Sequence, residues 1–228
     1  MVATFLIEVT LALYVIVRYH MNSTLRLIVA TLGMLALFQL SEYFVCGGLG
    51  ADSSTWSRIG YVAITALPPL GLHLLYVLSG RQSRKLVVAA YASMALFMSY
   101  FLVSPTAFVG HECTGNYVIF QIGMTASRAY GLYYYSLLLA AMLTGWRWMM
   151  NAKKGQKKMR QQIGGLVVGY LVFLVPTGIA NSVKPETRSG IPSIMCGFAV
   201  LFALILALYI APRAATLREK ISLPFLYK

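Results

Sequence analysis

Long runs of apolar residues, separated by short breaks that are basic or contain glycine or proline, dominate this chain. A helix needs roughly 20 mostly apolar residues to cross the hydrocarbon core of a membrane. Backbone groups in lipid must be satisfied within the segment, and the runs lack the alternation of a membrane β-barrel. The pattern therefore predicts an all-α, polytopic membrane protein built as a seven-transmembrane-helix bundle. The predicted spans are Ala3–Val17, Leu25–Val45, Ile59–Ser79, Leu86–Ser104, Tyr130–Met150, Ile163–Ala180 and Ser193–Ala211.

One interval does not fit a tight connection between two spans. From Ser104 to Ala129 the chain is too long for a short turn, and part of it is apolar. We expect an ordered outer loop with a short interfacial helix; the alternative is a fifth span that starts near Tyr117. Residues 1–212 then form one membrane domain, and residues 213–228 form a cytoplasmic tail.

Composition supports the membrane assignment. The chain is 59% hydrophobic and 11% charged, with a mean hydropathy of +0.72, whereas soluble domains carry about 25% charged residues. A net charge of +13 in a soluble protein would suggest nucleic acid as a partner. Here 15 of the 19 basic residues fall in one set of loops and the tail. The positive-inside rule therefore predicts an outer N-terminus and an inner C-terminus, and no nucleic-acid role.

Signatures of catalysis are missing from the sequence. It contains no P-loop, no H-E-x-x-H and no G-x-S-x-G motif. Its histidines, His20, His73 and His111, fall at different depths, and the last span has no lysine to anchor retinal. We expect no enzyme activity, no cofactor and no metal site.

Ionisable groups inside membrane spans are costly and are functional candidates by default. Glu8 lies midway along the first span, while Gln39 and Glu42 share one face of the second with Cys46. Glu42 needs a partner, and Arg58 or Arg128 at the outer boundary could supply one. Both carboxyl groups have two open interpretations: a structural interaction that packs the bundle, or contact with a ligand.

Prolines predict breaks in two spans. Pro68 and Pro69 interrupt the third span, and Pro176 interrupts the sixth. A proline removes a backbone donor, so the freed carbonyl must be satisfied by a neighbour or by water. We expect these prolines to act as hinges. His73, on the inner side of the first break, is either a switch or simply a hydrogen-bonded histidine.

The cysteines offer one disulfide. Cys46 ends the second span on the outside and Cys113 lies in the long outer loop. If the outside is oxidising, these two could pin the loop over the bundle. Cys196, early in the seventh span, is the competing partner or a free thiol.

Several segments resemble a known family. The run Trp56–Tyr61, the stretch Leu67–Leu70 and the helix end Leu75–Gly80 resemble the third helix of the seven-helix N-terminal sensor region of bacterial histidine kinases. The segment Arg160–Ile163, followed by the break at Pro176, resembles the sixth helix of that region. The similarity extends over about Leu25–Ala211.

The resemblance implies a receptor-like bundle in the bacterial cytoplasmic (inner) membrane. It would detect a small hydrophobic or amphiphilic ligand in its outer half and signal to a kinase or another partner. Membrane lipids would also be partners, and the oligomeric state stays open. We expect a pocket between the second, third and fifth helices. Its polar anchors would be Gln39, Glu42 and Arg128, and its aromatic walls would be Trp56, Tyr61 and Tyr134.

The sequence departs from the kinases at its C-terminal end. Only 16 residues follow Pro212, without a phosphoacceptor histidine or an ATP-binding domain. Either the chain is a piece of a longer kinase, or the bundle acts through a separate partner. Two further functions stay open: an accessory subunit of a larger membrane complex, and a small-solute transporter. Transport is the less favoured, because Pro68 and Pro176 would not superpose in an inverted repeat.

Overall fold

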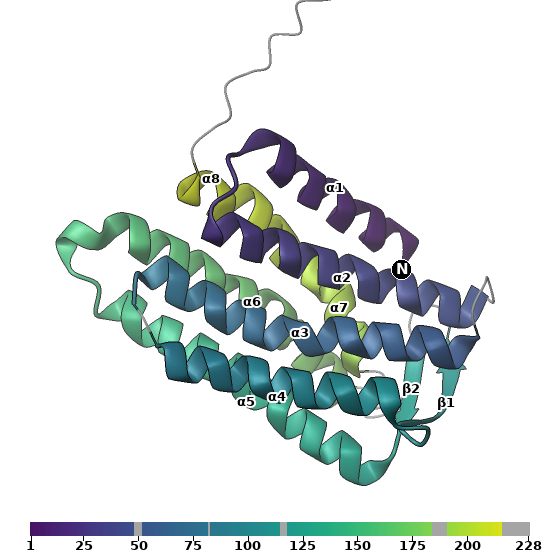
Figure 1. Cartoon of the computed structure of the whole chain (residues 1–228). Helices are drawn as coiled ribbons and strands as arrows, with labels where there is room; N and C mark the ends of the chain where they lie inside the picture. Colours follow the sequence, from purple (N-terminus) through teal and green to yellow (C-terminus); the bar gives the residue numbers. More distant parts are fainter. Residues whose placement is uncertain (48–51, 82, 115–117, 184–190, 216–228) are drawn as a thin grey trace, which may run out of the picture.

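A computed structural model describes residues 1–47, 52–81, 83–114, 118–183 and 191–215. The chain forms a bundle of helices that run alternately up and down, with one small β-hairpin at one end (Figure 1). The helices are α1 (Val2–Arg18), α2 (Ser23–Gly47), α3 (Ser53–Ser79), α4 (Arg84–Val103), α5 (Met124–Met150), α6 (Lys157–Val183), α7 (Ile191–Leu204) and α8 (Ala211–Ala214). A π-helical segment (η3, Ile205–Ile210) joins α7 to α8, and a 3₁₀ turn (η1, Lys154–Gln156) precedes α6.

Five of these helices are long and apolar enough to cross a membrane: α2, α3, α4, α6 and the continuous helix Ile191–Ala214. The chain is therefore helical and has the character of a multi-pass membrane protein. Within the described residues, α1 and α5 fall outside this group. Helix α1 has only 17 residues, and α5 carries four tyrosines and two arginines in its 27 residues.

The interval between α4 and α5 differs from our expectation. Instead of an interfacial helix it contains two antiparallel strands, β1 (Phe108–Cys113) and β2 (Val118–Ile122), with Cys113 opposite Val118. In β2, Val118 and Phe120 are buried while Gln121 is exposed, which is the alternation of a strand with one face on the core. Helix α5 then starts at Met124, which is neither the predicted Tyr130 nor the alternative near Tyr117.

A disulfide ties this hairpin to the bundle. Cys46, one residue before the end of α2, is bonded to Cys113 at the end of β1, across a sequence separation of 67. Cys196 is a buried free thiol. A cross-link of this kind restricts the unfolded chain and typically adds about 2–4 kcal/mol of stability. It holds the hairpin over the ends of the helices.

Helix α3 begins with a capped turn. The Asp52 carboxylate accepts hydrogen bonds from the Thr55 hydroxyl (2.7 Å) and the Thr55 backbone N–H (3.3 Å). These bonds, chiefly the one from the hydroxyl, hold the pKa of Asp52 below its ordinary value. Such an N-cap satisfies one of the donors that the first turn of a helix leaves open.

Glycines let aromatic rings approach the backbone of α6 and α3. A Cβ at Gly165 would lie 2.7 Å from Tyr209, and a Cβ at Gly169 would lie 2.5 Å from Phe202. The spacing Gly165-x-x-x-Gly169 thus receives two rings of the last helix, where the motif more often brings two backbones together. Likewise, Gly71 of α3 lies against the hydroxyl of Tyr170 of α6.

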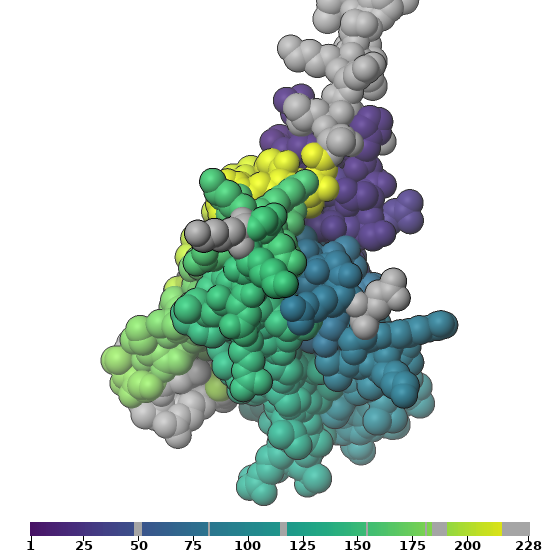
Figure 2. Space-filling view, turned by 90° about the vertical axis from the view of Figure 1, so that its left-hand side faces the viewer, coloured from purple at the N-terminus to yellow at the C-terminus, as the bar shows by residue number. Residues whose placement is uncertain are grey.

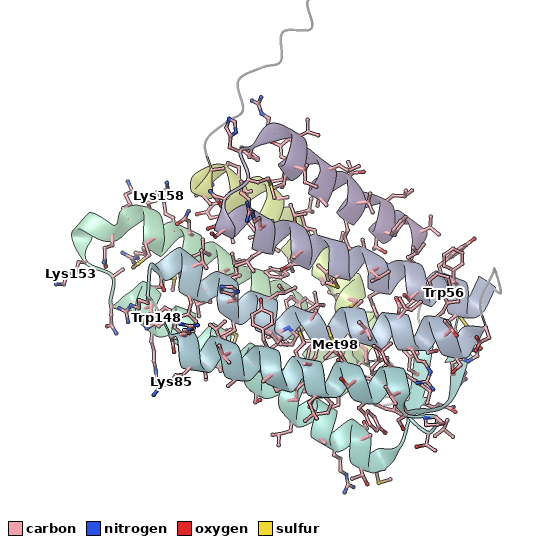
Figure 3. All side chains as sticks on the ribbon, viewed as in Figure 1. Trp56, Lys85, Met98, Trp148, Lys153 and Lys158 are labelled. Atoms are coloured by element: carbon pink, nitrogen blue, oxygen red, sulfur yellow. A yellow bond between two sulfur atoms is a disulfide. The ribbon has the colours of Figure 1, made fainter. Side chains whose placement is uncertain are left out.

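The two ends of the bundle differ in charge. The hairpin and the N-terminus lie at one end, and the α1–α2, α3–α4 and α5–α6 turns lie with α8 at the other (Figure 1). Lys85, Lys153 and Lys158 all project from the second end, far from Trp56 (Figure 3). We call this second end the basic end. Some residues used in the predictions lie outside the described residues. They are Tyr117, the alternative start of the fifth span, and five of the basic residues counted for the orientation: Lys184, Arg188, Arg218, Lys220 and Lys228.

Candidate functional site

A cavity of about 430 Å³ lies next to the hairpin, between β2, α3, α5 and the start of α7. Its aromatic wall comes from all of these elements except α7: Tyr61, Phe120, Tyr130, Tyr134 and Tyr135. The first turns of α7 contribute Ile191, Pro192, Met195 and Cys196. Gln121 and Ser127 supply polar groups, and none of the described residues that line the cavity carries a charge. A mostly apolar space with a few polar groups is typical of a small-molecule site.

The aromatic wall is packed as one cluster. The ring of Tyr61 lies 5.4 Å from that of Phe120 and 5.6 Å from that of Tyr130, with the centroids as reference points. Tyr130 in turn lies 5.8 Å from Tyr134. Centroid separations of 4.5–7 Å are those of favourable aromatic pairs. The hairpin residue Phe120 is therefore held by the same contacts that position the tyrosines of α3 and α5.

Next to this wall, Pro68 and Pro69 interrupt the backbone hydrogen bonds of α3 without ending the helix, and we call this interruption the proline break. Pro69 has no N–H to donate to the carbonyl of Thr65, four residues earlier. The hydroxyl of Tyr133 on α5 donates to that carbonyl instead, at 2.8 Å. The Thr65 hydroxyl donates to the Tyr61 carbonyl (2.5 Å) and lies 3.2 Å from the hydroxyl oxygen of Tyr130. One cavity residue, Tyr130, is thus in contact with the break itself.

A second group of polar side chains lies outside the cavity lining, between α1, α2 and α7. Glu8, Gln39 and Glu42 are 0%, 2% and 1% exposed. The Thr4 hydroxyl donates to the amide oxygen of Gln39 (2.8 Å), which joins α1 to α2. Both oxygens of Glu8, the nitrogen of Gln39 and one oxygen of Glu42 are buried without a hydrogen-bond partner among the described residues. We call Thr4, Glu8, Gln39, Glu42 and Ser193 the buried polar group.

Ser193 connects this group to the hairpin. Its hydroxyl donates to the backbone carbonyl of Val118 in β2, at 2.6 Å. Its side chain also lies close to the carboxyl group of Glu42. A buried polar group without a partner costs free energy, so the bond from Ser193 to Val118 stabilises the strand. The hairpin is therefore attached to the bundle at Cys113 by a disulfide and at Val118 by a hydrogen bond.

The structure separates the residues that we predicted as one pocket. Tyr61 and Tyr134 line the cavity, whereas Gln39 and Glu42 lie in the buried polar group. Trp56 stacks on Phe44 with centroids 4.5 Å apart, outside the cavity lining, and its indole N–H has no partner.

The prediction that Arg58 or Arg128 is the partner of Glu42 is wrong. Arg58 donates to the carbonyls of Phe101 (2.6 Å) and Leu102 (3.1 Å) at the end of α4. The last carbonyls of a helix have no helical donor, so the guanidinium of Arg58 satisfies them. Arg128 is exposed and does not line the cavity.

The predicted hinge residues lie in two helices. Pro68 and Pro69 are buried within the continuous helix α3, and Pro176 is half-buried within α6. His73 is half-buried, with its Nδ1 atom 3.1 Å from the hydroxyl of Tyr91 on α4. This contact gives His73 the hydrogen bond that its non-switch interpretation requires.

The strand β2 and the first turns of α7 are the parts of the cavity that the sequence did not predict. The β-branched and aromatic residues of Val118–Ile122 were a weak signal for the strand. For Met195 and Cys196 only burial on a helix face could be predicted. Among the described residues, no three His, Cys, Asp or Glu side chains come together in a way that could hold a metal ion.

Comparisons with protein-family models, with curated proteins and with solved structures find no match for this chain. The function has to be argued from the cavity and the residues around it.

Proposed function

We propose that the chain is a seven-helix, receptor-like membrane module that binds a small ligand in the cavity beside the hairpin and has no catalytic role. The observation that supports the proposal most directly is the contact between the cavity and the proline break. Tyr130 lines the cavity and lies 3.2 Å from Thr65, the residue whose carbonyl Pro69 leaves without its helical donor. A ligand against Tyr130 therefore acts on a helix that reaches the other end of the bundle.

The orientation follows from the charges. Arg81, Arg84, Lys85, Lys153 and Lys158 belong to turns at the basic end, away from the hairpin. Because basic residues concentrate on the cytoplasmic side, this end faces the cytoplasm and the hairpin faces outward. The disulfide between Cys46 and Cys113 agrees with an oxidising exterior. In this orientation α1 and α5 also cross the membrane, which makes seven spans.

The lining defines the class of ligand. None of the described residues that line the cavity is charged, so these residues would leave an ionic ligand without a countercharge, which is costly in an apolar site. The side chains of Gln121, Ser127 and the tyrosines offer hydrogen bonds. The ligand is therefore a neutral, mainly apolar molecule with one or a few polar groups.

The signal passes along α3. A ligand that displaces Tyr130 changes its contact with Thr65, and Tyr133 holds the neighbouring carbonyl. Helix α3 continues from this break to Ser79 at the basic end, where it contacts α4 and α6. A kinase or another partner in the bacterial cytoplasmic membrane would receive the change there, as the resemblance to the sensor region implies.

A photo-crosslinking experiment tests the site. The probe is a long-chain alcohol that carries a diazirine, a neutral amphiphile of the proposed class. Gly131→Leu fills the cavity, because Gly131 lines it and a Cβ there meets no atom within 4 Å. The matched control is Gly33→Leu on α2, which also has open space at its Cβ and does not line the cavity.

We expect labelling of the peptides that contain β2 and the first turns of α7 in the unaltered chain and in Gly33→Leu. The Gly131→Leu variant loses most of this labelling and keeps the labelling of the lipid-exposed helix α4, which serves as the internal reference. Equal labelling of the cavity peptides in all three proteins would overturn the proposed site.

A further inference from the structure

A second groove of about 430 Å³ lies at the basic end, between the end of α3 and the start of α4. It is distinct from the cavity beside the hairpin, with which it shares no lining residue. Arg81 and Arg84 line it, together with Ser83, and none of the described residues that line it is acidic. The groove therefore has a strong positive charge in a restricted space.

Arg81 is held in place by aromatic residues. The guanidinium carbon of Arg81 lies 4.6 Å from the centre of the Trp148 ring on α5, a cation–π contact. Trp148 also packs edge-to-face against Tyr76, which lines the groove, at 5.2 Å between centroids. Gly80, with φ +65°, ends α3 in the left-handed conformation and turns the chain toward Arg81.

The start of α4 adds backbone donors to the same place. Ser83 is the N-cap of α4 without a side-chain cap bond, and the first helical bond runs from the N–H of Val87 to the Ser83 carbonyl. The N–H groups of the first turn therefore have no helical acceptor. Such groups favour phosphate, and here they add to the two arginines.

The other wall of the groove is apolar and continues onto an exposed helix face. Val77, Val87 and Val88 line it, and Val88 is 57% exposed. Further along α4, Leu96 is 70% exposed. Only 11% of the apolar stretch of α4 is buried inside the molecule. This surface lies beside lipid in a membrane, so the charged groove opens onto the path of acyl chains.

We propose that this groove is a binding site for one anionic phospholipid, whose phosphate lies between Arg81 and Arg84 and whose acyl chains run along α4. Basic pockets between membrane helices on the cytoplasmic side bind acidic lipid headgroups by this chemistry. The valine wall favours a lipid over a soluble phosphate, because a free anion gains nothing from apolar surface. Figure 2 views the molecule from this end, where the end of α3 and the start of α4 lie beside α5 and α6.

Native mass spectrometry of the delipidated full chain tests the proposal. The protein is offered phosphatidylglycerol and phosphatidylcholine with identical acyl chains. The test variant is Arg81→Gln with Arg84→Gln. The control is Lys157→Gln with Arg160→Gln, which removes the same charge from exposed positions outside the groove.

We expect one phosphatidylglycerol to be retained in preference to phosphatidylcholine by the unaltered chain and by the control. In the test variant the preference falls about thirtyfold, since each basic residue near an anionic headgroup contributes about a fivefold gain. If the double variant does not fold, Arg84→Gln alone is the test. This variant keeps the Arg81–Trp148 contact and should lose part of the preference for phosphatidylglycerol.

Three results would each overturn the proposal. The first is retention of phosphatidylglycerol by the double variant at the level of the unaltered chain. The second is an equal loss in the control, which would indicate a general effect of charge. The third is retention of glycerol phosphate, the headgroup without acyl chains, as strong as that of phosphatidylglycerol. This result would assign the groove to a soluble anion.

Discussion

Gly71 and Tyr170 show how closely α3 and α6 approach one another. Tyr170 is buried, its ring is stacked on that of Phe202 at 5.5 Å between centroids, and its hydroxyl has no hydrogen-bond partner among the described residues. That hydroxyl occupies the space that a Cβ at Gly71 would need. Glycine is therefore required here for space and not for backbone conformation.

Gly71→Ala should lower the free energy of unfolding by about 1–3 kcal/mol, the usual cost of overpacking. Thermal unfolding in detergent measures the loss, and Gly33→Ala, with open space at its Cβ, is the control. Because the hydroxyl of Tyr170 has no partner, Tyr170→Phe should cost little by itself and should recover most of the loss in the double variant. A double variant as unstable as Gly71→Ala would contradict the assigned clash.

Glu42 is a buried carboxyl group that lies close to the neutral side chain of Ser193. Glu42→Gln keeps the shape and a hydrogen-bonding group, and it removes a charge that is costly to bury. We expect the unfolding temperature to change little, while labelling of the cavity by the diazirine alcohol changes through Ser193 and β2. A variant that fails to assemble would show that the carboxyl group is required for packing.

At the scale of the element, α3 depends on α5 at its proline break. Tyr133 donates to the Thr65 carbonyl that Pro69 leaves open. Tyr133→Phe should therefore cost about 1–3 kcal/mol, because it leaves a buried carbonyl without a donor. Tyr135→Phe, at a residue that is 37% exposed, is the comparison for loss of a tyrosine hydroxyl from the same helix.

A double-mutant cycle with Pro69→Ala isolates this bond. Alanine restores the backbone N–H, which can donate to the Thr65 carbonyl within α3. Thermal unfolding should then show a smaller cost of Tyr133→Phe in the Pro69→Ala background than in the unaltered chain. Equal costs in the two backgrounds would mean that Tyr133 stabilises the bundle by packing alone.

For the whole molecule, hydropathy along the chain predicted the helices well and the hairpin poorly. Twenty apolar residues are a strong signal, because lipid leaves few alternatives to a helix. The strands β1 and β2 have six and five residues and depend on pairing with one another and on the disulfide. Such short segments carry little local signal, so an interfacial helix was an equally reasonable expectation for Val118–Ile122.

The candidate site was predictable in part for the same reason. Tyr61 and Tyr134 were identified because aromatic residues in an outer half-span are visible in the sequence. The partner of Arg58 was not, since the carbonyls of Phe101 and Leu102 are backbone groups whose exposure depends on where α4 ends. The residues of β2 could join the cavity only once the hairpin was known.

The disulfide also makes part of the molecule a covalent ring. Residues Cys46 to Cys113 form a closed loop that contains all of α3 and α4, with the basic turn at Arg81 and Arg84 on its far side. A single cut at this turn should leave one species on a non-reducing gel, when it is made from the cytoplasmic side of sealed vesicles by a site-specific protease whose recognition sequence is inserted into the turn. After reduction the same sample should give two fragments. Cleavage from the outer side alone would reverse the proposed orientation, and two fragments without reductant would show that the ring is open.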